Sequence, residues 1–185
     1  MVATMGTSAD NAVVDIREGA AADAEPIAAL HTRSWRTAYA GIFPADYLEG
    51  PVEEQQAAMW HERLVNGAKG ELLVADDGTS IAGFAYLIPE DGRVLLDNLH
   101  VDPALKRSGI GGVLLRHALD RAAGQELYLE VLKENRPAIA FYERHGATRA
   151  RQFVERFPGF EVEVLEYYWS GMRSDTVPRR SSQAS

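Results

Sequence analysis

Residues 93–124, RVLLDNLHVDPALKRSGIGGVLLRHALDRAAG, decide the fold. The first part is an apolar run that predicts a strand through Leu99 and Val101. Pro103 ends this strand because proline has no amide hydrogen for a ladder. A basic, glycine-rich turn follows, and apolar residues then recur at helical spacing up to Gly124, which is placed to end the helix. The stretch therefore predicts a strand, a turn and a helix in direct succession.

The turn that opens this helix has the composition of an anion site. Gly109, Gly111 and Gly112 let the backbone approach a ligand, and the first amides of a helix have no intrahelical partner. Lys106 and Arg107 add positive charge at the same place, so the turn favours a phosphate group. A tight turn that needs glycine for its own geometry is the alternative interpretation. The turn matches neither the P-loop nor the dinucleotide-binding fingerprint.

Composition narrows the class of protein. A chain of 185 residues, 46% hydrophobic and 25% charged, is typical of one globular domain. The absence of cysteine excludes disulfides and a cysteine nucleophile, and no acidic or histidine cluster has metal-ligand spacing, so we expect no metal. The net charge of −8 argues against a nucleic-acid partner and favours a cationic acceptor such as an amine. With no apolar run of membrane-spanning length and no secretory pattern, we expect a cytoplasmic protein without a membrane partner.

Periodicity and turn signals along the rest of the chain predict one mixed α/β domain over residues 13–170, with segments 1–12 and 171–185 disordered. Asp23 is placed to cap the first helix, which Gly41 ends. We expect a second helix near 52–65 and a helix over 135–145. The expected strands cover 13–17, 71–75, 80–88, 94–101, 126–132, 152–157 and 160–169.

Residues 129–147, LEVLKENRPAIAFYERHGA, are the second informative stretch. Asn135 and Tyr142 are seven residues apart, about two helical turns, so both can face one ligand channel. Asn135 can cap the helix or bond a polar chain, and the Tyr142 phenol could protonate a departing thiolate. Simple capping and packing are the alternative roles. Glu130 lies within an otherwise apolar strand, which is costly unless the carboxylate is solvated, paired or functional.

Together, the two stretches resemble the GNAT superfamily of N-acetyltransferases. Residues 106–111, KRSGIG, are similar to the family's pyrophosphate loop, written Q/R-x-x-G-x-G/A, with lysine in the first place. The helix that asparagine opens, with a tyrosine two turns later, resembles the family's second motif. The resemblance implies a central twisted, mostly antiparallel sheet flanked by helices, with strands that splay around an acetyl-CoA site.

The resemblance also implies site residues. Acetyl-CoA is the expected co-substrate, with the expected contacts Leu99, His100, Val101, Arg107, Ser108, Gly109, Ile110, Gly111, Gly112 and Asn135. Tyr142 matches the usual proton donor to the CoA sulfur. Glu130 matches the glutamate of a Leu-Glu-Val strand in ribosomal-protein alanine N-acetyltransferases, where it is taken as the base; a structural or water-holding role for Glu130 stays open. His100 could titrate near neutral pH.

The acceptor side is less defined. His31, Trp35 and Tyr39 recur at helical spacing and could line the acceptor pocket, although Trp35 could equally be core. We expect direct acetyl transfer to a primary amine of a small molecule. A protein N-terminus is the alternative acceptor, and a non-catalytic acyl-CoA sensor is the alternative from another class. A homodimer is also open, because members of the family often form dimers.

Overall fold

The computed structural model describes residues 14–157 and 160–171. The strands are β1 (Asp15–Glu18), β2 (Glu71–Asp76), β3 (Ile81–Pro89), β4 (Arg93–Val101), β5 (Glu126–Leu132), β6 (Thr148–Phe157) and β7 (Phe160–Trp169). The helices are α1 (Ala24–Ala38), α2 (Ala45–Glu49), α3 (Val52–Leu64), α4 (Ile110–Arg121) and α5 (Arg136–Arg144). The segments predicted to be disordered lie outside the described residues, except for residue 171. The predicted turn at Pro158 and Gly159 also lies outside them.

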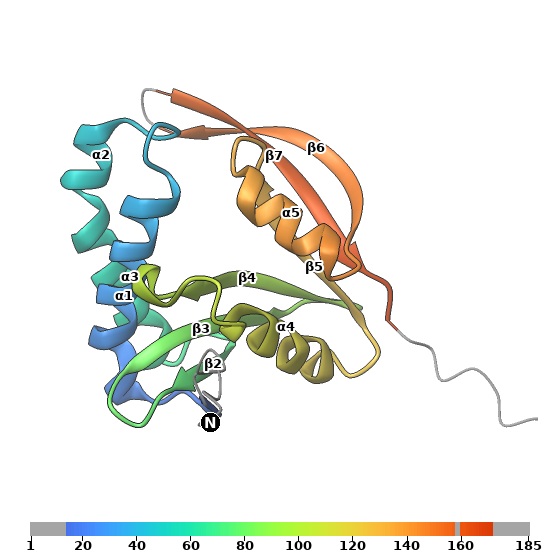
Figure 1. The fold of residues 1–185 in the computed structure, drawn as a ribbon, viewed down its shortest axis with the longest axis horizontal. Helices are drawn as coiled ribbons and strands as arrows, with labels where there is room; N and C mark the ends of the chain where they lie inside the picture. Colours follow the sequence, from blue (N-terminus) through green and yellow to red (C-terminus); the bar gives the residue numbers. More distant parts are fainter. Residues whose placement is uncertain (1–13, 158–159, 172–185) are drawn as a thin grey trace, which may run out of the picture.

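The strands form one seven-stranded sheet in the order β1-β2-β3-β4-β5-β7-β6. Every neighbouring pair is antiparallel except β4 and β5, which are parallel. That parallel pair is short, since only residues 93–95 of β4 face 126–128 of β5. Beyond it the two strands diverge (Figure 1). The mixed α/β fold with a mostly antiparallel, splayed sheet is therefore confirmed.

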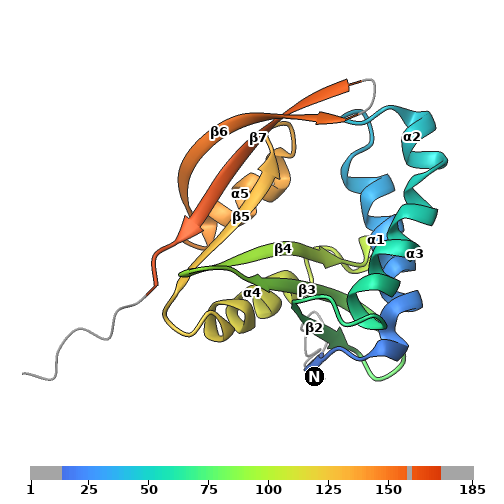
Figure 2. The ribbon, with the colours of Figure 1, turned by 180° about the vertical axis from the view of Figure 1, so that it is seen from behind.

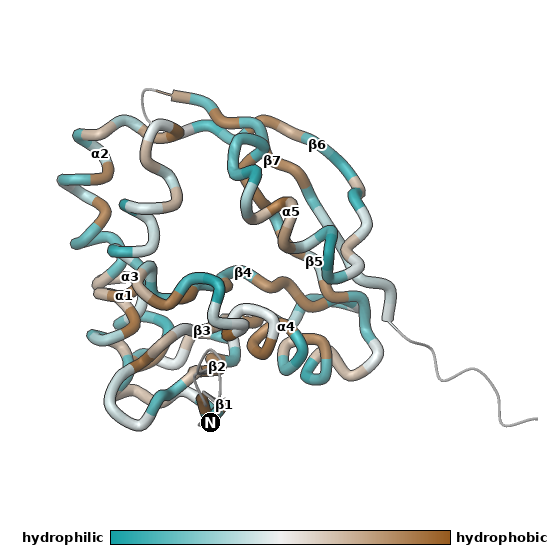
Figure 3. The backbone as a smooth tube through the Cα atoms, viewed as in Figure 1, coloured by the Kyte–Doolittle hydropathy of each residue, from teal (hydrophilic) through white to brown (hydrophobic). Residues whose placement is uncertain are grey.

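Helices cover both faces of the sheet (Figure 2). On one face, α1 and α3 bury Ile27 and Trp60 against Phe84 and Tyr86 of β3. On the other face, the apolar side of α4 packs on β2, β3 and β4. Figure 3 shows hydrophobic residues along parts of β3 and β4 and alternating along α4, as expected for a helix with one buried side. No helix in residues 14–157 and 160–171 is long and apolar enough to span a membrane.

A third cluster joins the α1–α2 segment to the last two strands. Phe43, Leu48 and Val52 pack there against Val162 and Val164. The helix α2, which contains Leu48, is a difference from the sequence prediction. It has five residues, too few to show a helical period.

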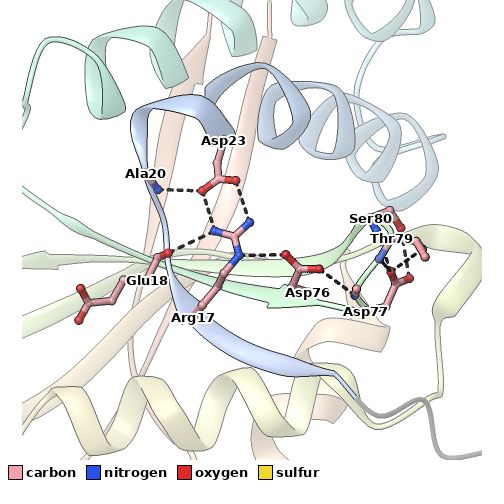
Figure 4. Close-up of polar contacts among 9 residues, drawn as sticks. Arg17, Glu18, Ala20, Asp23, Asp76, Asp77, Thr79 and Ser80 are labelled. Atoms are coloured by element: carbon pink, nitrogen blue, oxygen red, sulfur yellow. Dashed lines mark hydrogen bonds and ion pairs between the residues drawn. The ribbon is translucent and has the colours of Figure 1, made fainter.

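Figure 4 shows the corner where β1 meets β2 and the start of α1. The Arg17 guanidinium donates to both carboxylate oxygens of Asp23 at 2.9 Å and, through Nε, to Asp76 at 2.9 Å. The Asp23 carboxylate also accepts from the Ala20 amide at 2.8 Å. Asp23 therefore occupies the predicted N-cap position, but its side chain makes no cap bond to α1, because Arg17 and Ala20 engage it. These hydrogen bonds, led by Arg17, lower the pKa of Asp23.

His31 is a buried polar residue of the core, 1% exposed. The Trp60 indole donates to His31 Nδ1 at 3.0 Å. Because an indole nitrogen can only donate, Nδ1 must accept, and the ring is neutral with its proton on Nε2. Burial, followed by the nearby His100 and Arg63, holds the pKa of His31 well below its ordinary value.

We predict that this buried histidine makes stability depend on pH. The unfolded chain takes up the proton near pH 6.5, whereas the folded chain resists it. The stability is therefore complete above pH 6.5 and falls at lower pH, with a slope of up to about 1.4 kcal/mol per pH unit for each such histidine. In urea unfolding at pH 7.5 and 5.5, His31→Gln should lose less on acidification than the wild type. The exposed His61 provides the control, and His61→Gln should keep the full loss. An equal loss in both variants would contradict the prediction.

Candidate active site

The splay between β4 and β5 opens a cleft of about 970 Å³. The turn before α4, helix α5 along its length and the end of α1 complete its walls. This volume is in the range of small-molecule and cofactor sites. All of the predicted cofactor contacts line it, as do Glu130 and Tyr142. Lining alone does not show their roles, which stay predictions.

The turn before α4 presents backbone amides to the cleft. Gly109 is the N-cap residue with φ 86°, in the left-handed region that glycine adopts without strain. The first bond of the helix runs from the Val113 amide to the Gly109 carbonyl at 3.2 Å. The amides of Ile110, Gly111 and Gly112 precede that bond and are left for an external acceptor. With the helix dipole, they make this end of the cleft suited to an anion.

The cations of the cleft are left without counter-ions. In residues 14–157 and 160–171, four basic side chains line the cleft, and none of the four is in an ion pair: Lys106, Arg107, Arg116 and Arg144. Every ion-paired arginine or lysine of the same residues lies away from the cleft lining. Unpaired cations that line the cleft of a protein of net charge −8 favour a polyanionic ligand there.

The edge of β4 is open along the cleft. The Asp102 amide donates to the Ala82 carbonyl of β3 at 2.8 Å. Since alternate residues of a strand direct their amides to opposite edges, those of Leu99 and Val101 face the gap toward β5. An extended ligand can therefore bond to this edge as an additional strand would.

The second motif supplies Asn135 and Tyr142. The Asn135 side chain accepts from the Ala138 amide at 3.3 Å, so the predicted cap of α5 is confirmed. Tyr142 is half-buried, and its ring packs on Trp169 with centroids 6.1 Å apart. Burial, with a smaller effect of the nearby Tyr39 phenol, raises the pKa of Tyr142. Tyr142 is therefore protonated at neutral pH, as a proton donor must be.

Glu130 lies on β5 at the edge of the cleft, with 39% of its side chain exposed. Burial is the main cause that raises its pKa, and Arg151 opposes the shift. A carboxylate with a raised pKa is a better proton acceptor, so the environment suits a general base.

His100 does not titrate near neutral pH as the sequence suggested. Burial, followed by the charge of Lys106, lowers its pKa to about 3. Its Nδ1 lies 2.9 Å from the Ser34 hydroxyl, and its ring is 4.4 Å from that of His31, centroid to centroid. His100 is thus neutral, and it lines the cleft together with Ser34.

The three residues predicted to line the acceptor pocket lie in different places. Tyr39 lines the cleft, and burial raises its pKa to about 12. His31 lies in the core, and Trp35 packs with the third cluster, so neither lines the cleft. Ser34 and Ala38 stand there instead, on the same helix. The role of these residues in acceptor binding stays a prediction.

Sequence reasoning could not place Asp97. The β3–β4 register passes from Tyr86↔Asn98 to Leu87↔Leu96, so Asp97 is an extra residue in a bulge. Arg63 pairs with Asp97 at 2.7 Å and donates to Asn98 at 2.7 Å. In a regular strand Asp97 would face away from His100, but here both residues line the cleft. Among the described residues, no group of three or more histidine or acidic side chains could hold a metal ion.

Comparison with known proteins adds to this geometry. The model of the acetyltransferase (GNAT) family matches residues 32–147. The uncharacterised N-acetyltransferase YuaI of Bacillus subtilis (strain 168) is 26% identical over 167 residues, 85% of this chain and 93% of that protein. The ribosomal protein bS18 alanine N-acetyltransferase of Salmonella typhimurium is 33% identical over 124 residues, 61% of this chain and 82% of that protein. The solved structure of PaiA N-acetyltransferase from Thermoplasma acidophilum, in complex with coenzyme A, aligns with a TM-score of 0.69 at 24% identity, covering 85% and 99% of the two chains.

Arg107 allows a test of the anion wall, because its φ of 71° is in the left-handed region. This conformation costs a non-glycine residue roughly 1–2 kcal/mol, whereas glycine adds roughly 0.5–1 kcal/mol of unfolded-state entropy. We therefore predict that Arg107→Gly is more stable than Arg107→Ala, by up to about 1 kcal/mol in urea unfolding.

Both Arg107 variants should bind coenzyme A about tenfold more weakly in calorimetry, since each loses a charged contact. Arg149 lies outside the cleft lining, so Arg149→Ala should keep the wild-type affinity. Equal stability of the two Arg107 variants would show that the turn is unstrained. An unchanged affinity would show that Arg107 does not contact the anion.

Proposed function

The chain belongs to the acetyltransferase (GNAT) family, and from this premise we propose that it transfers the acetyl group of acetyl-CoA directly to a primary amine of a small molecule. One observation carries the proposal. The helix-opening amides, the open edge of β4, Glu130 and Tyr142 all line a single cleft. A donor of acetyl groups and an acceptor amine would meet there between a base and an acid.

The cofactor fits the cleft in a definite direction. Its diphosphate would lie on the amides of residues 110–112, beside Lys106 and Arg107. Its pantetheine arm would run along the open edge of β4, bonded to the backbone of Leu99 and Val101. The fold match to PaiA N-acetyltransferase, solved with coenzyme A, supports a site of this kind in the fold. This direction brings the thioester toward Glu130 and Tyr142.

The reaction needs three proton transfers. Glu130, or water that it holds, takes a proton from the acceptor ammonium, and the free amine attacks the thioester carbonyl. The Val101 amide, which faces the gap, donates to the oxyanion of the tetrahedral intermediate. The carbon–sulfur bond then breaks, Tyr142 gives its proton to the departing CoA thiolate, and the nitrogen of the new amide passes its surplus proton back to the Tyr142 oxygen. The chain has no cysteine, so no acetyl-cysteine intermediate forms.

The charge of the cleft favours a small cationic acceptor. The carboxylates of Asp97 and Glu130 line the cleft and attract a compact cation.

A protein N-terminus is the second candidate acceptor. The 33% identity to the ribosomal protein bS18 alanine N-acetyltransferase favours it, as does the Leu-Glu-Val sequence around Glu130. That similarity spans 61% of this chain. An N-terminal ammonium would meet the same base and the same thioester, so the chemistry is shared and only the acceptor differs.

An acceptor screen tests the proposal. Thiol release from acetyl-CoA is followed with small primary amines and, in parallel, with peptides that begin with alanine. We expect release with small amines and an acetylated product by mass spectrometry. Release with peptides alone would favour the second candidate. Binding of acetyl-CoA in calorimetry without thiol release from any acceptor would favour the sensor.

Tyr142→Phe should lower kcat by about 10²–10⁴, the usual contribution of a positioned acid. The affinity for acetyl-CoA should stay within about twofold of the wild type, because only the hydroxyl is lost. Calorimetry and steady-state kinetics measure the two quantities. Tyr168→Phe removes a hydroxyl from β7, outside the cleft lining, and should leave kcat unchanged. An unchanged kcat in Tyr142→Phe would remove this phenol from the mechanism.

A further inference from the structure

Glu130 has another carboxylate directly opposite it. In the β5–β7 pair, Glu130 faces Glu166, and like charges in such cross-strand positions repel. Glu166 is 5% exposed. Two arginines satisfy it: Arg93 Nη2 lies 2.9 Å from Oε1, and Arg151 Nε lies 2.7 Å from Oε2. The sheet therefore holds a buried, neutralised carboxylate beside the candidate base.

A bulge in β6 places Arg151 at this pair. The β6–β7 register passes from Arg149↔Tyr167 to Gln152↔Leu165. Two residues of β6, one of them Arg151, therefore stand opposite the single residue Glu166. The guanidinium packs on the Phe153 ring, 5.1 Å from its centroid, and Nη2 reaches to 3.7 Å from Glu130 Oε1. One side chain thus contacts the buried carboxylate and the cleft carboxylate together.

We propose that Arg151 is a positioning residue for the acetyl-transfer reaction: anchored on the buried Glu166, its guanidinium holds the Glu130 carboxylate in an ion pair at the edge of the cleft. Arg151 itself does not line the cleft, so it acts through Glu130 rather than on the substrate. The inference rests on the proposed function, in which Glu130 is the base.

The other charged groups around Glu130 oppose its ionisation. Glu166 on β7, Glu155 on β6 and Asp97 on β4 each raise the pKa of Glu130, in addition to burial. Within residues 14–157 and 160–171, Arg151 is the one cation that lowers it. Two other arginines are paired with other carboxylates. Arg63 pairs with Asp97, and Arg93 pairs with Glu126 and Glu166. Loss of Arg151 would therefore leave Glu130 among carboxylates with no cation of its own.

Variants that remove a positive or a negative charge near Glu130 test this inference on the full-length chain. Arg151→Gln should move the acidic limb of the kcat/KM–pH profile upward, by roughly 0.5–1 pH unit given the solvent exposure of the pair. Glu155→Gln removes an opposing charge from an exposed position, so it should move the limb downward. Arg151→Lys keeps the charge and should restore most of the wild-type limb. The NMR titration of the Glu130 side-chain carboxyl carbon should follow the same order without relying on activity.

Arg156→Gln is the matched control. Arg156 is on the same strand but pairs with Glu161, so its replacement removes the same charge and should leave the limb in place. Melting curves of every variant report on folding. A limb and a Glu130 titration that do not move in Arg151→Gln would overturn the inference, as would an equal shift in Arg156→Gln. If Arg151→Gln does not fold, the other two variants decide. The inference is overturned if Glu155→Gln shows no downward shift of the limb, or if Arg151→Lys does not restore most of the wild-type limb.

Glu130→Gln separates this inference from the function on which it rests. If this variant keeps full activity, Glu130 is not the base, and the proposed mechanism fails whatever Arg151 does. If it loses activity while Arg151→Gln leaves both readouts unchanged, the mechanism stands and only the role of Arg151 is rejected.

Discussion

The short parallel pairing of β4 with β5 is the constraint on which the rest of the molecule depends. Arg93 secures it at the closed end, with an ion pair to Glu126 at 2.8 Å and its guanidinium 3.6 Å from the centroid of the Tyr128 ring. The same guanidinium reaches Glu166 on β7. Three strands are thus tied at one point, and the sheet can open beyond it without losing its continuity. An open sheet edge inside a domain leaves backbone groups unpaired, and a ligand that bonds to them offsets that cost.

The parallel direction also explains why two distant stretches of sequence converge. Parallel strands end at the same side of a sheet, so the helices that follow them begin side by side. The turn before α4 follows β4, and Asn135 opens α5 after β5, so two helix N-termini flank the splay. An antiparallel β4–β5 pair would have put them at opposite ends. The anion site and the candidate proton donor therefore share a cleft because of strand direction.

The sequence predicted the strands, every α-helix of the described residues except α2, and the turn before α4 that lines the cleft, since these depend on local signals: periodicity, glycine at φ 86° and an asparagine cap. It was insufficient where tertiary context decides. A helical stripe does not show whether His31 faces the cleft or the core, and the bulges at Asp97 and Arg151 leave no mark in composition. The partners of Arg151 also come from three different strands, so no spacing rule could have brought them together.

The distribution of charge along the cleft follows from these arrangements. Cations without counter-ions lie near the amides that open α4. Toward β6 and β7, the ion pairs of Arg151 link Glu130 and Glu166, and Glu130 still lines the cleft. An anionic cofactor and a cationic acceptor would therefore be drawn to different ends of the same space. Their reactive groups would meet near Tyr142, where burial disfavours charge on the phenol. At that point the ammonium has to give up its proton before it can attack, and the thiolate has to gain one as it leaves. A low-polarity centre between two charged ends favours the proton transfer from the ammonium to a carboxylate, because that transfer replaces two charged groups with neutral ones.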